Sequence, residues 1–120
     1  MPKPFNSSLK KAHPDLKARY KDFADPGKPV DDWDMRMQSL LRDFIMSRPM
    51  ATDIIIDSLV CRTNVCEIRL LENRKYLLLG LFGELMQQPW MANQVNGSVD
   101  FNPDNSNAFY MLLMRKPTTN

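Results

Sequence analysis

Two cysteines are the residues of this 120-residue chain best suited to chemistry, and both lie in the segment SLVCRTNVCEIRL. They are Cys61 and Cys66, with the four residues RTNV between them. Two nearby thiols can form a disulfide, act as a redox couple, or supply half of a tetrahedral zinc site. The elements that position the two cysteines decide between these chemistries.

The segments that flank the cysteines have the patterns of β-strands. Residues 54–60 are rich in β-branched side chains, and VCEIRLL at 65–71 alternates apolar residues with Glu67 and Arg69. The RTNV segment has a common length for a hairpin loop, and Asn64 tolerates a positive φ. We therefore predict a β-hairpin closed by a four-residue loop.

This hairpin places Cys61 opposite Cys66, with their β-carbons near the separation that a disulfide needs. The same register sets three further pairs opposite each other: Leu59 and Ile68, Val60 and Glu67, Asp57 and Leu70. The last pair puts a carboxylate on the apolar face, so we expect the pairing to end near it. A bridge across so short a loop contributes about 2 kcal/mol and mainly fixes the register.

The other chemistries fit the sequence less well. Catalytic thiol pairs usually have two residues between them at a helix start, whereas these have four and lie on strands. A zinc site needs about two more ligands, and the one histidine, His13, lies in the N-terminal segment. We expect a disulfide and no metal or cofactor. Two alternatives remain open: a pair of reduced thiols in a cytosolic protein, and a thiol oxidoreductase or thiol sensor that uses Cys61 and Cys66.

Catalysis usually needs a proton-transfer group beside a nucleophile or substrate. His13 lies in a proline-rich segment, and Asp53 and Asp57 have the pattern of polar residues at a strand edge. We expect no catalytic residues, and we predict that the protein is not an enzyme.

Residues 1–30 differ in composition from the rest of the chain. They contain five prolines and seven Lys/Arg against three Asp, whereas the remaining residues carry nine Lys/Arg against eleven Asp/Glu. We predict a basic arm or linker here, with one short helix from Pro14 to Phe23 that docks on the body through Leu16, Tyr20 and Phe23. Binding of nucleic acid or an anionic membrane surface by this arm is an alternative function. We favour a solvated linker, because the lysines are interleaved with aspartates.

The segment VDDWDMRMQSLLRDFIM at 30–46 is the clearest predicted helix, because its apolar residues recur at steps of three and four. Asp31 or Asp32 would cap its start, and Arg48 with Pro49 would end it.

A second helix is predicted within ENRKYLLLGLFGELMQQPW at 72–90, capped by Asn73 and stopped by Pro89. Its expected inner face consists of five residues: Tyr76, Leu77, Leu81, Leu85 and Met86. Three further residues widen the apolar surface almost all round: Leu78, Leu79 and Phe82. We therefore expect this helix to be deeply buried or covered by a partner.

The C-terminal part holds two β-like runs separated by NPDNSN, which predicts a second hairpin. The order αββαββ follows for a single domain at 31–117. We expect an α+β fold with both helices packed on one face of a four-stranded antiparallel sheet. A disordered tail is expected at 118–120.

Four stretches, PVDDWDMRMQSLLRDF, IDSLVCRTNVCEIRL, the apolar helix ending near QPW, and the closing YMLLMRKP, form a recognisable succession. It resembles a family of small uncharacterised domains in exported proteins of Gram-negative bacteria, which carry an aromatic-led helix and a Cys-Arg-(Ser/Thr)-x-x-Cys hairpin. The resemblance covers roughly residues 28–117 and depends mainly on five residues: Trp33, Cys61, Arg62, Thr63 and Cys66. Glu67 stands where the family often has arginine. The resemblance implies an envelope location, a disulfide and a shared fold, and it implies no reaction.

We therefore expect a non-catalytic domain of the periplasm or cell envelope of a Gram-negative bacterium that binds another protein. The partner would be another envelope component or a second copy of the chain, and we expect no nucleic acid. The candidate contact residues are Leu78, Leu79, Phe82, Tyr110 and Leu112. The last two lie on the final strand, which we expect to have an exposed side and an edge that accepts a partner strand. The chain starts without an apolar stretch of signal-peptide length, so an export signal or membrane tether is expected to precede residue 1.

Overall fold

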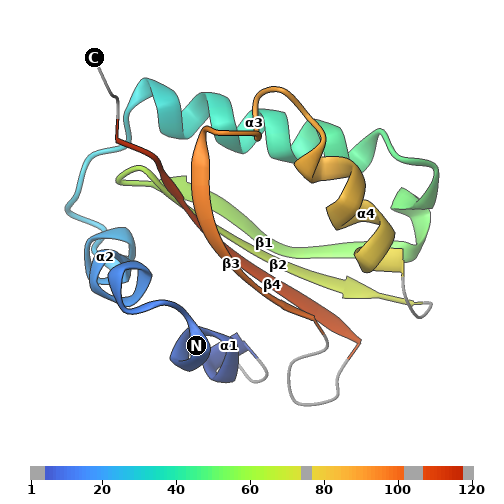
Figure 1. Cartoon of the computed structure of the whole chain (residues 1–120), viewed down its shortest axis with the longest axis horizontal. Coiled ribbons are helices and arrows are strands. Elements are labelled where there is room, and N and C mark those ends of the chain that lie inside the picture. The colour runs from blue at the N-terminus through green and yellow to red at the C-terminus, as the bar shows by residue number, and fades with distance from the viewer. Residues whose placement is uncertain (1–4, 74–76, 102–106, 118–120) are drawn as a thin grey trace.

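The computed structural model describes residues 5–73, 77–101 and 107–117, and these residues form helices on both faces of one antiparallel sheet (Figure 1). In chain order the elements are α1 (Phe5–Lys11), α2 (Pro14–Ala24), α3 (Asp32–Met46), the 3₁₀ helix η1 (Pro49–Asp53), β1 (Ile54–Arg62), β2 (Val65–Glu72), α4 (Leu77–Met86), β3 (Val95–Phe101) and β4 (Ala108–Arg115).

The four strands form a single sheet in the order β1-β2-β4-β3, and every neighbouring pair is antiparallel. Each of the two hairpins contributes one central strand and one edge strand. The predicted α+β fold and the order αββαββ from α3 onward are confirmed. The predicted NPDNSN turn and the tail at 118–120 fall wholly or mostly outside the described residues.

Helix α3 lies across one face of the sheet because its apolar residues form one stripe. Trp33, Met37, Leu41 and Ile45 recur at steps of four and are all buried against the strands. Asp31 caps the start of the helix, and its side chain and that of Asp34 each accept a hydrogen bond from the other residue's backbone N–H. The predicted cap is therefore confirmed.

Helix α4 lies on the same face as α3 and buries Leu78, Leu81 and Leu85. The predicted inner face is right for Leu81 and Leu85, but the structure exposes Met86 and buries Leu78 instead. A carboxylate oxygen of Glu72 accepts the hydrogen bond from the Leu78 backbone N–H at 3.0 Å. The predicted cap at Asn73 would bind residues that lie outside the described part of the chain. Tyr76 lies outside the described residues.

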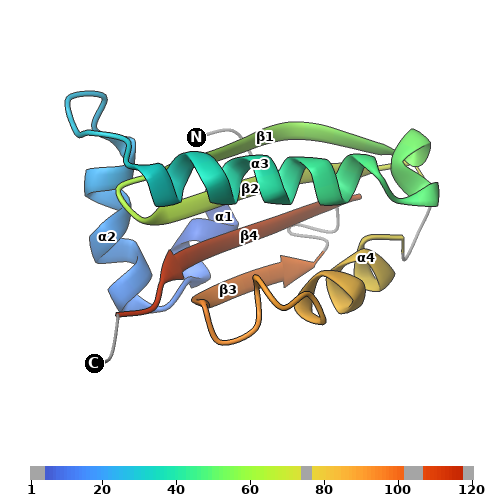
Figure 2. The ribbon, with the colours of Figure 1, turned by 90° about the horizontal axis from the view of Figure 1, so that it is seen from above.

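The second face of the sheet is covered by α1 and α2, so the molecule has three layers (Figures 1 and 2). A second apolar core joins Phe5, Leu16 and Phe23 of these helices to Tyr110 and Leu112 of β4. The predicted short helix and its docking residues are confirmed. Residues 5–24 are nevertheless not a solvated linker, because the apolar second face of β4 requires a cover.

Candidate functional site

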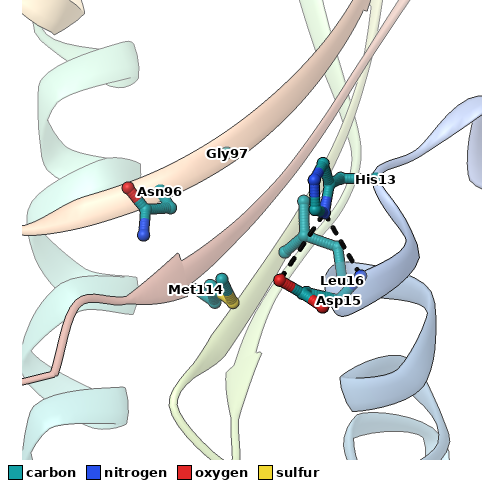
Figure 3. Close-up of a pocket in the computed structure, with 6 residues that line it drawn as sticks. All are labelled: His13, Asp15, Leu16, Asn96, Gly97 and Met114. Carbon is teal, nitrogen blue, oxygen red and sulfur yellow. Dashed lines mark hydrogen bonds and ion pairs between the residues drawn. The ribbon is translucent and has the colours of Figure 1, made fainter.

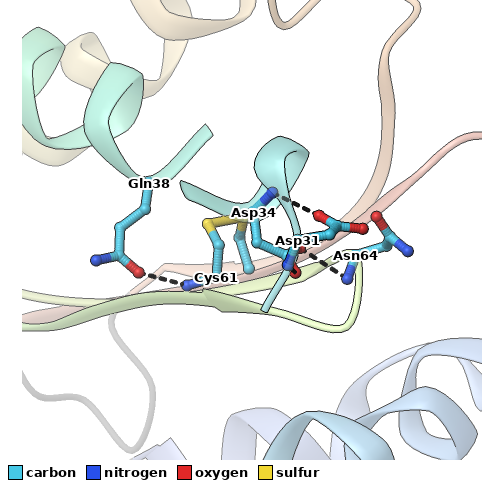
Figure 4. Close-up of a disulfide and its surroundings, with 6 residues drawn as sticks. Asp31, Asp34, Gln38, Cys61 and Asn64 are labelled. Atoms are coloured by element: carbon cyan, nitrogen blue, oxygen red, sulfur yellow. Dashed lines mark hydrogen bonds between the residues drawn. A yellow bond between two sulfur atoms is a disulfide. The ribbon is translucent and has the colours of Figure 1, made fainter. Parts of the chain in front are cut away.

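The two cysteines form the predicted disulfide at the end of the β1–β2 hairpin (Figure 4). Cys61 lies opposite Cys66 with a Cα–Cα distance of 4.0 Å, and the predicted pairs Leu59–Ile68 and Val60–Glu67 are present. The side chains of Cys61 and Cys66 are buried, with 2% and 0% of their surface exposed. Thiol exchange needs an accessible sulfur, so this burial favours a structural bridge over a redox couple.

The hairpin turn is tighter than the predicted four-residue loop. Arg62 pairs with Val65, which leaves only Thr63 and Asn64 in the turn. Both turn residues have positive φ, 51° and 64°, as a two-residue hairpin turn requires. Asn64 tolerates this conformation well, whereas the β-branched Thr63 does so at a cost.

A β-bulge resolves the conflict that the sequence places at Asp57. The register shifts between Ile56 and Ser58, so Ile56 lies opposite Leu70 and Asp57 has no opposite partner. The extra residue turns the exposed Asp57 away from the apolar face. The strands pair on past this point to Ile54, so the expectation that pairing ends here is wrong.

Asp34 holds the turn against the start of α3. Its Oδ1 accepts a hydrogen bond from the backbone N–H of Asn64 at 2.8 Å, and its Oδ2 accepts one from the N–H of Asp31 at 3.0 Å. Asp34 is fully buried, and this burial raises the pKa of its carboxyl group. The side chain thus joins the hairpin to the helix cap (Figure 4).

Two further side chains, one from the hairpin and one from α3, join this hairpin end to other segments. The Arg62 Nη2 donates to the carbonyl oxygens of Asp25 and Lys28 at 2.8 and 3.1 Å. The Oε1 of Gln38 accepts the backbone N–H of Cys61 at 2.9 Å. The Cys-Arg-Thr-x-x-Cys segment is therefore held by many internal bonds, which indicates a structural role.

Replacing Thr63 with asparagine is expected to raise the free energy of unfolding by about 1 kcal/mol. Asparagine tolerates positive φ, whereas a β-branched residue is strained there. Urea unfolding of the two proteins measures the difference, and equal or lower stability of Thr63→Asn would contradict the strain.

Beneath α1 and α2, a buried polar cluster occupies the second face of the sheet. Glu67 is 2% exposed, its Oε1 lies 2.7 Å from the Arg69 Nη2, and its Oε2 accepts the Tyr110 hydroxyl at 2.7 Å. Burial, and then the negative charge of Glu67, raises the pKa of Tyr110, so its phenol stays protonated and donates. Burial and Glu67 raise the pKa of Tyr20 in the same direction.

The last strand does not have the exposed side or the free edge that the sequence suggested. Tyr110 and Leu112 are buried under α1 and α2, and β4 lies between β2 and β3 in the sheet. Leu78 is also buried, on the inner side of α4. These three residues are therefore not surface contacts in this structure.

The other two predicted contacts lie on a surface flank of α4. Leu79 is 55% exposed, and Phe82 is half-buried. Steps of three and four residues place Leu79, Phe82 and the exposed Met86 on one side of the helix, which we call the α4 flank. The Phe82 ring lies 5.5 Å from the ring of Phe101 at the end of β3, and Phe101 is itself 37% exposed.

The opposite side of α4 faces the end of α3. Its Glu84 Oε2 lies 3.6 Å from the Nη1 of Arg48, which follows α3 in the chain. The α4 flank consequently faces away from α3, toward β3. Gly80 and Gly83 are exposed, and a Cβ added to either would meet nothing within 4 Å. Packing within the described chain thus does not require these glycines, although each costs a helix about 1 kcal/mol relative to alanine.

A groove of about 280 Å³ lies on the side of β3 that faces α2, between this strand and the start of that helix (Figure 3). Its lining residues are His13, Asp15, Leu16, Asn96, Gly97 and Met114. His13 caps α2, because its Nδ1 accepts the backbone N–H of Asp15 at 3.2 Å. His13 therefore has a structural role as the N-terminal cap of α2.

The described part of the chain contains no group of three or more His, Cys, Asp or Glu side chains that could hold a metal ion. Its helices are also too short or too polar to cross a membrane. Comparisons of the chain with protein-family models, curated protein sequences and solved structures find no match.

Proposed function

We propose that the chain is a non-catalytic protein-binding domain of the periplasm or envelope of a Gram-negative bacterium. The observation that carries the proposal is the exposed apolar α4 flank beside the open edge of β3. Monomeric proteins rarely leave large apolar side chains clustered at the surface unless the cluster binds a partner. The α4 flank and Phe101 form such a cluster around one strand edge.

The disulfide supports the location outside the cytoplasm. Bridges of this kind persist in oxidising compartments and are rare where cellular thiols keep cysteines reduced. The two sulfurs are buried and joined within one rigid hairpin, so the bridge suits stability in such a compartment better than exchange. The disulfide and the family resemblance both favour an envelope location.

A photo-crosslinker at residue 79 tests the binding function. The chain with benzoylphenylalanine in place of Leu79 is irradiated alone and in an envelope extract of the producing bacterium. We expect a discrete crosslinked product of higher mass in at least one of the two samples. The control carries the same group in place of Ser39, an exposed position on α3.

The control reports random collisions, so equal products from both positions would overturn the proposed function. Absence of any product from position 79 in both samples would overturn it as well. A product from position 79 alone supports protein binding, and its mass identifies whether the partner is a second copy or another protein.

A further inference from the structure

Strand β3 is the last strand of the sheet, and among the described residues no other strand pairs with its outer edge. The N–H of Lys116 donates to the carbonyl oxygen of Gln94 at 2.9 Å, and residues 95–101 of β3 continue this register along β4. Because antiparallel pairs alternate, Asn96, Ser98 and Asp100 direct their backbone groups to β4. The residues that direct theirs outward are Val95, Gly97, Val99 and Phe101.

This edge lacks the protection that the opposite edge of the sheet has. On β1, the bulge at Asp57 breaks the row of backbone groups, and the N–H of Cys61 is already bonded to Gln38. Along β3 the register with β4 is unbroken, and the strand VNGSVDF contains no proline or lysine. Edge strands without a bulge, proline or lysine are templates for pairing with another strand.

We propose that a second copy of this chain pairs with β3, so that two sheets join into one of eight strands around a two-fold axis at Ser98. This inference rests on the proposed binding function and names the partner. In that register Gly97 lies opposite Val99 of the second copy, and Val95 lies opposite Phe101. All four outward-facing residues therefore find partners, and the arrangement is the same from either chain, as a two-fold interface requires.

The charges along β3 also match under this two-fold axis. Asp100 lies opposite Asn96 of the second copy, and Ser98 lies opposite itself, so no like charges meet. Asp100 is already held in its own chain by Ser8, whose Oγ donates to Oδ2 at 2.9 Å, and by the Lys11 Nζ at 3.7 Å. The strand edge is thus self-complementary without further rearrangement.

The apolar surface beside the edge fits the same partner. Figure 2 shows β3 and α4 along one side of the molecule, with β1 and α3 along the other. Phe101 and the α4 flank would lie at the interface between the two sheets, where Phe101 contacts Val95 of the second copy. Aromatic and β-branched residues directly opposite each other stabilise strand pairs.

A cysteine at position 98 tests the register directly. Ser98 and its copy would form a pair without hydrogen bonds between them, the kind in which opposite side chains are closest. The native bridge joins such a pair, with a Cα–Cα distance of 4.0 Å. Both native cysteines are bonded to each other, so the new thiol would be the only free one. We expect Ser98→Cys to form a covalent dimer that a reductant separates.

The matched control is Asn96→Cys, on the same face of the same strand. Its thiol would lie opposite Asp100 of the second copy, far from its own counterpart, so we expect at least a ten-fold smaller covalent fraction on non-reducing gels. Little or no dimer from Ser98→Cys would overturn the inference, and so would equal dimer from both variants. A crosslink from residue 79 to a different protein, with no Ser98→Cys dimer, would leave the binding function standing and remove the second copy as its partner.

Discussion

Replacing Glu67 with alanine is expected to lower the free energy of unfolding by about 3 to 5 kcal/mol. The change removes both the counter-charge of Arg69 and the acceptor of the Tyr110 hydroxyl, each 2.7 Å from a Glu67 oxygen. The Arg69 side chain is only 16% exposed, so its charge would lose its partner where water has little access. Urea unfolding with an unchanged m-value measures the loss.

Glu84→Ala is the matched control for this variant. Glu84 also pairs with an arginine, Arg48, but the two side chains are 48% and 32% exposed. Exposed pairs contribute little, so we expect a loss below about 1 kcal/mol. A Glu67→Ala variant no less stable than Glu84→Ala would show that the buried pair does not support the fold.

A double replacement separates the cost of a lone charge from the value of the pair. With Glu67→Met and Arg69→Met together, no unpaired charge remains under α1 and α2, and we expect most of the lost stability to return. The same cluster gives Glu67 a structural role as the partner of Arg69 and Tyr110. Glu67 is buried beneath α1 and α2, where its carboxylate is the hydrogen-bonding partner of buried groups.

The features that the sequence predicted correctly depend on short-range patterns. Alternation on either side of Cys61 and Cys66 set the hairpin register, because residues close in the chain paired with each other. The helix predicted within 30–46 followed from apolar steps of three and four and from a cap at Asp31 or Asp32, and the structure has it at Asp32–Met46 with Asp31 as the cap. Such signals act over a few residues and need no knowledge of the rest of the fold.

The features that the sequence missed depend on distant segments. Local patterns do not reveal that β4 pairs with β2 as well as with β3, which moved the free edge to β3. The run AFYMLLM in β4 did contain a signal, because a strand that is apolar on both faces needs a cover on each. That signal would have assigned α1 and α2 to the second face and buried Tyr110 and Leu112.

Reducing the Cys61–Cys66 bridge is expected to lower the free energy of unfolding by about 2 kcal/mol. The bridge spans a sequence separation of 5, so it restricts only a short loop of the unfolded chain. Oxidised and reduced forms of the same protein differ in no other bond, and urea unfolding with and without a reductant isolates the effect. We expect the reduced chain to stay folded, because Asp34, Arg62 and Gln38 still hold the hairpin.

The reduction potential of the bridge separates the structural role from thiol chemistry. A buried bridge in a folded hairpin should have a potential below about −300 mV, as structural disulfides in secreted proteins do. A value of about −120 to −270 mV would match catalytic thiol proteins and favour the redox alternative. Both cysteines are almost fully buried, so the thiolate of a reductant can attack a bridge sulfur only after the hairpin opens. That opening costs the hydrogen bonds of the turn, which is why the structural role predicts slow reduction as well as a low potential.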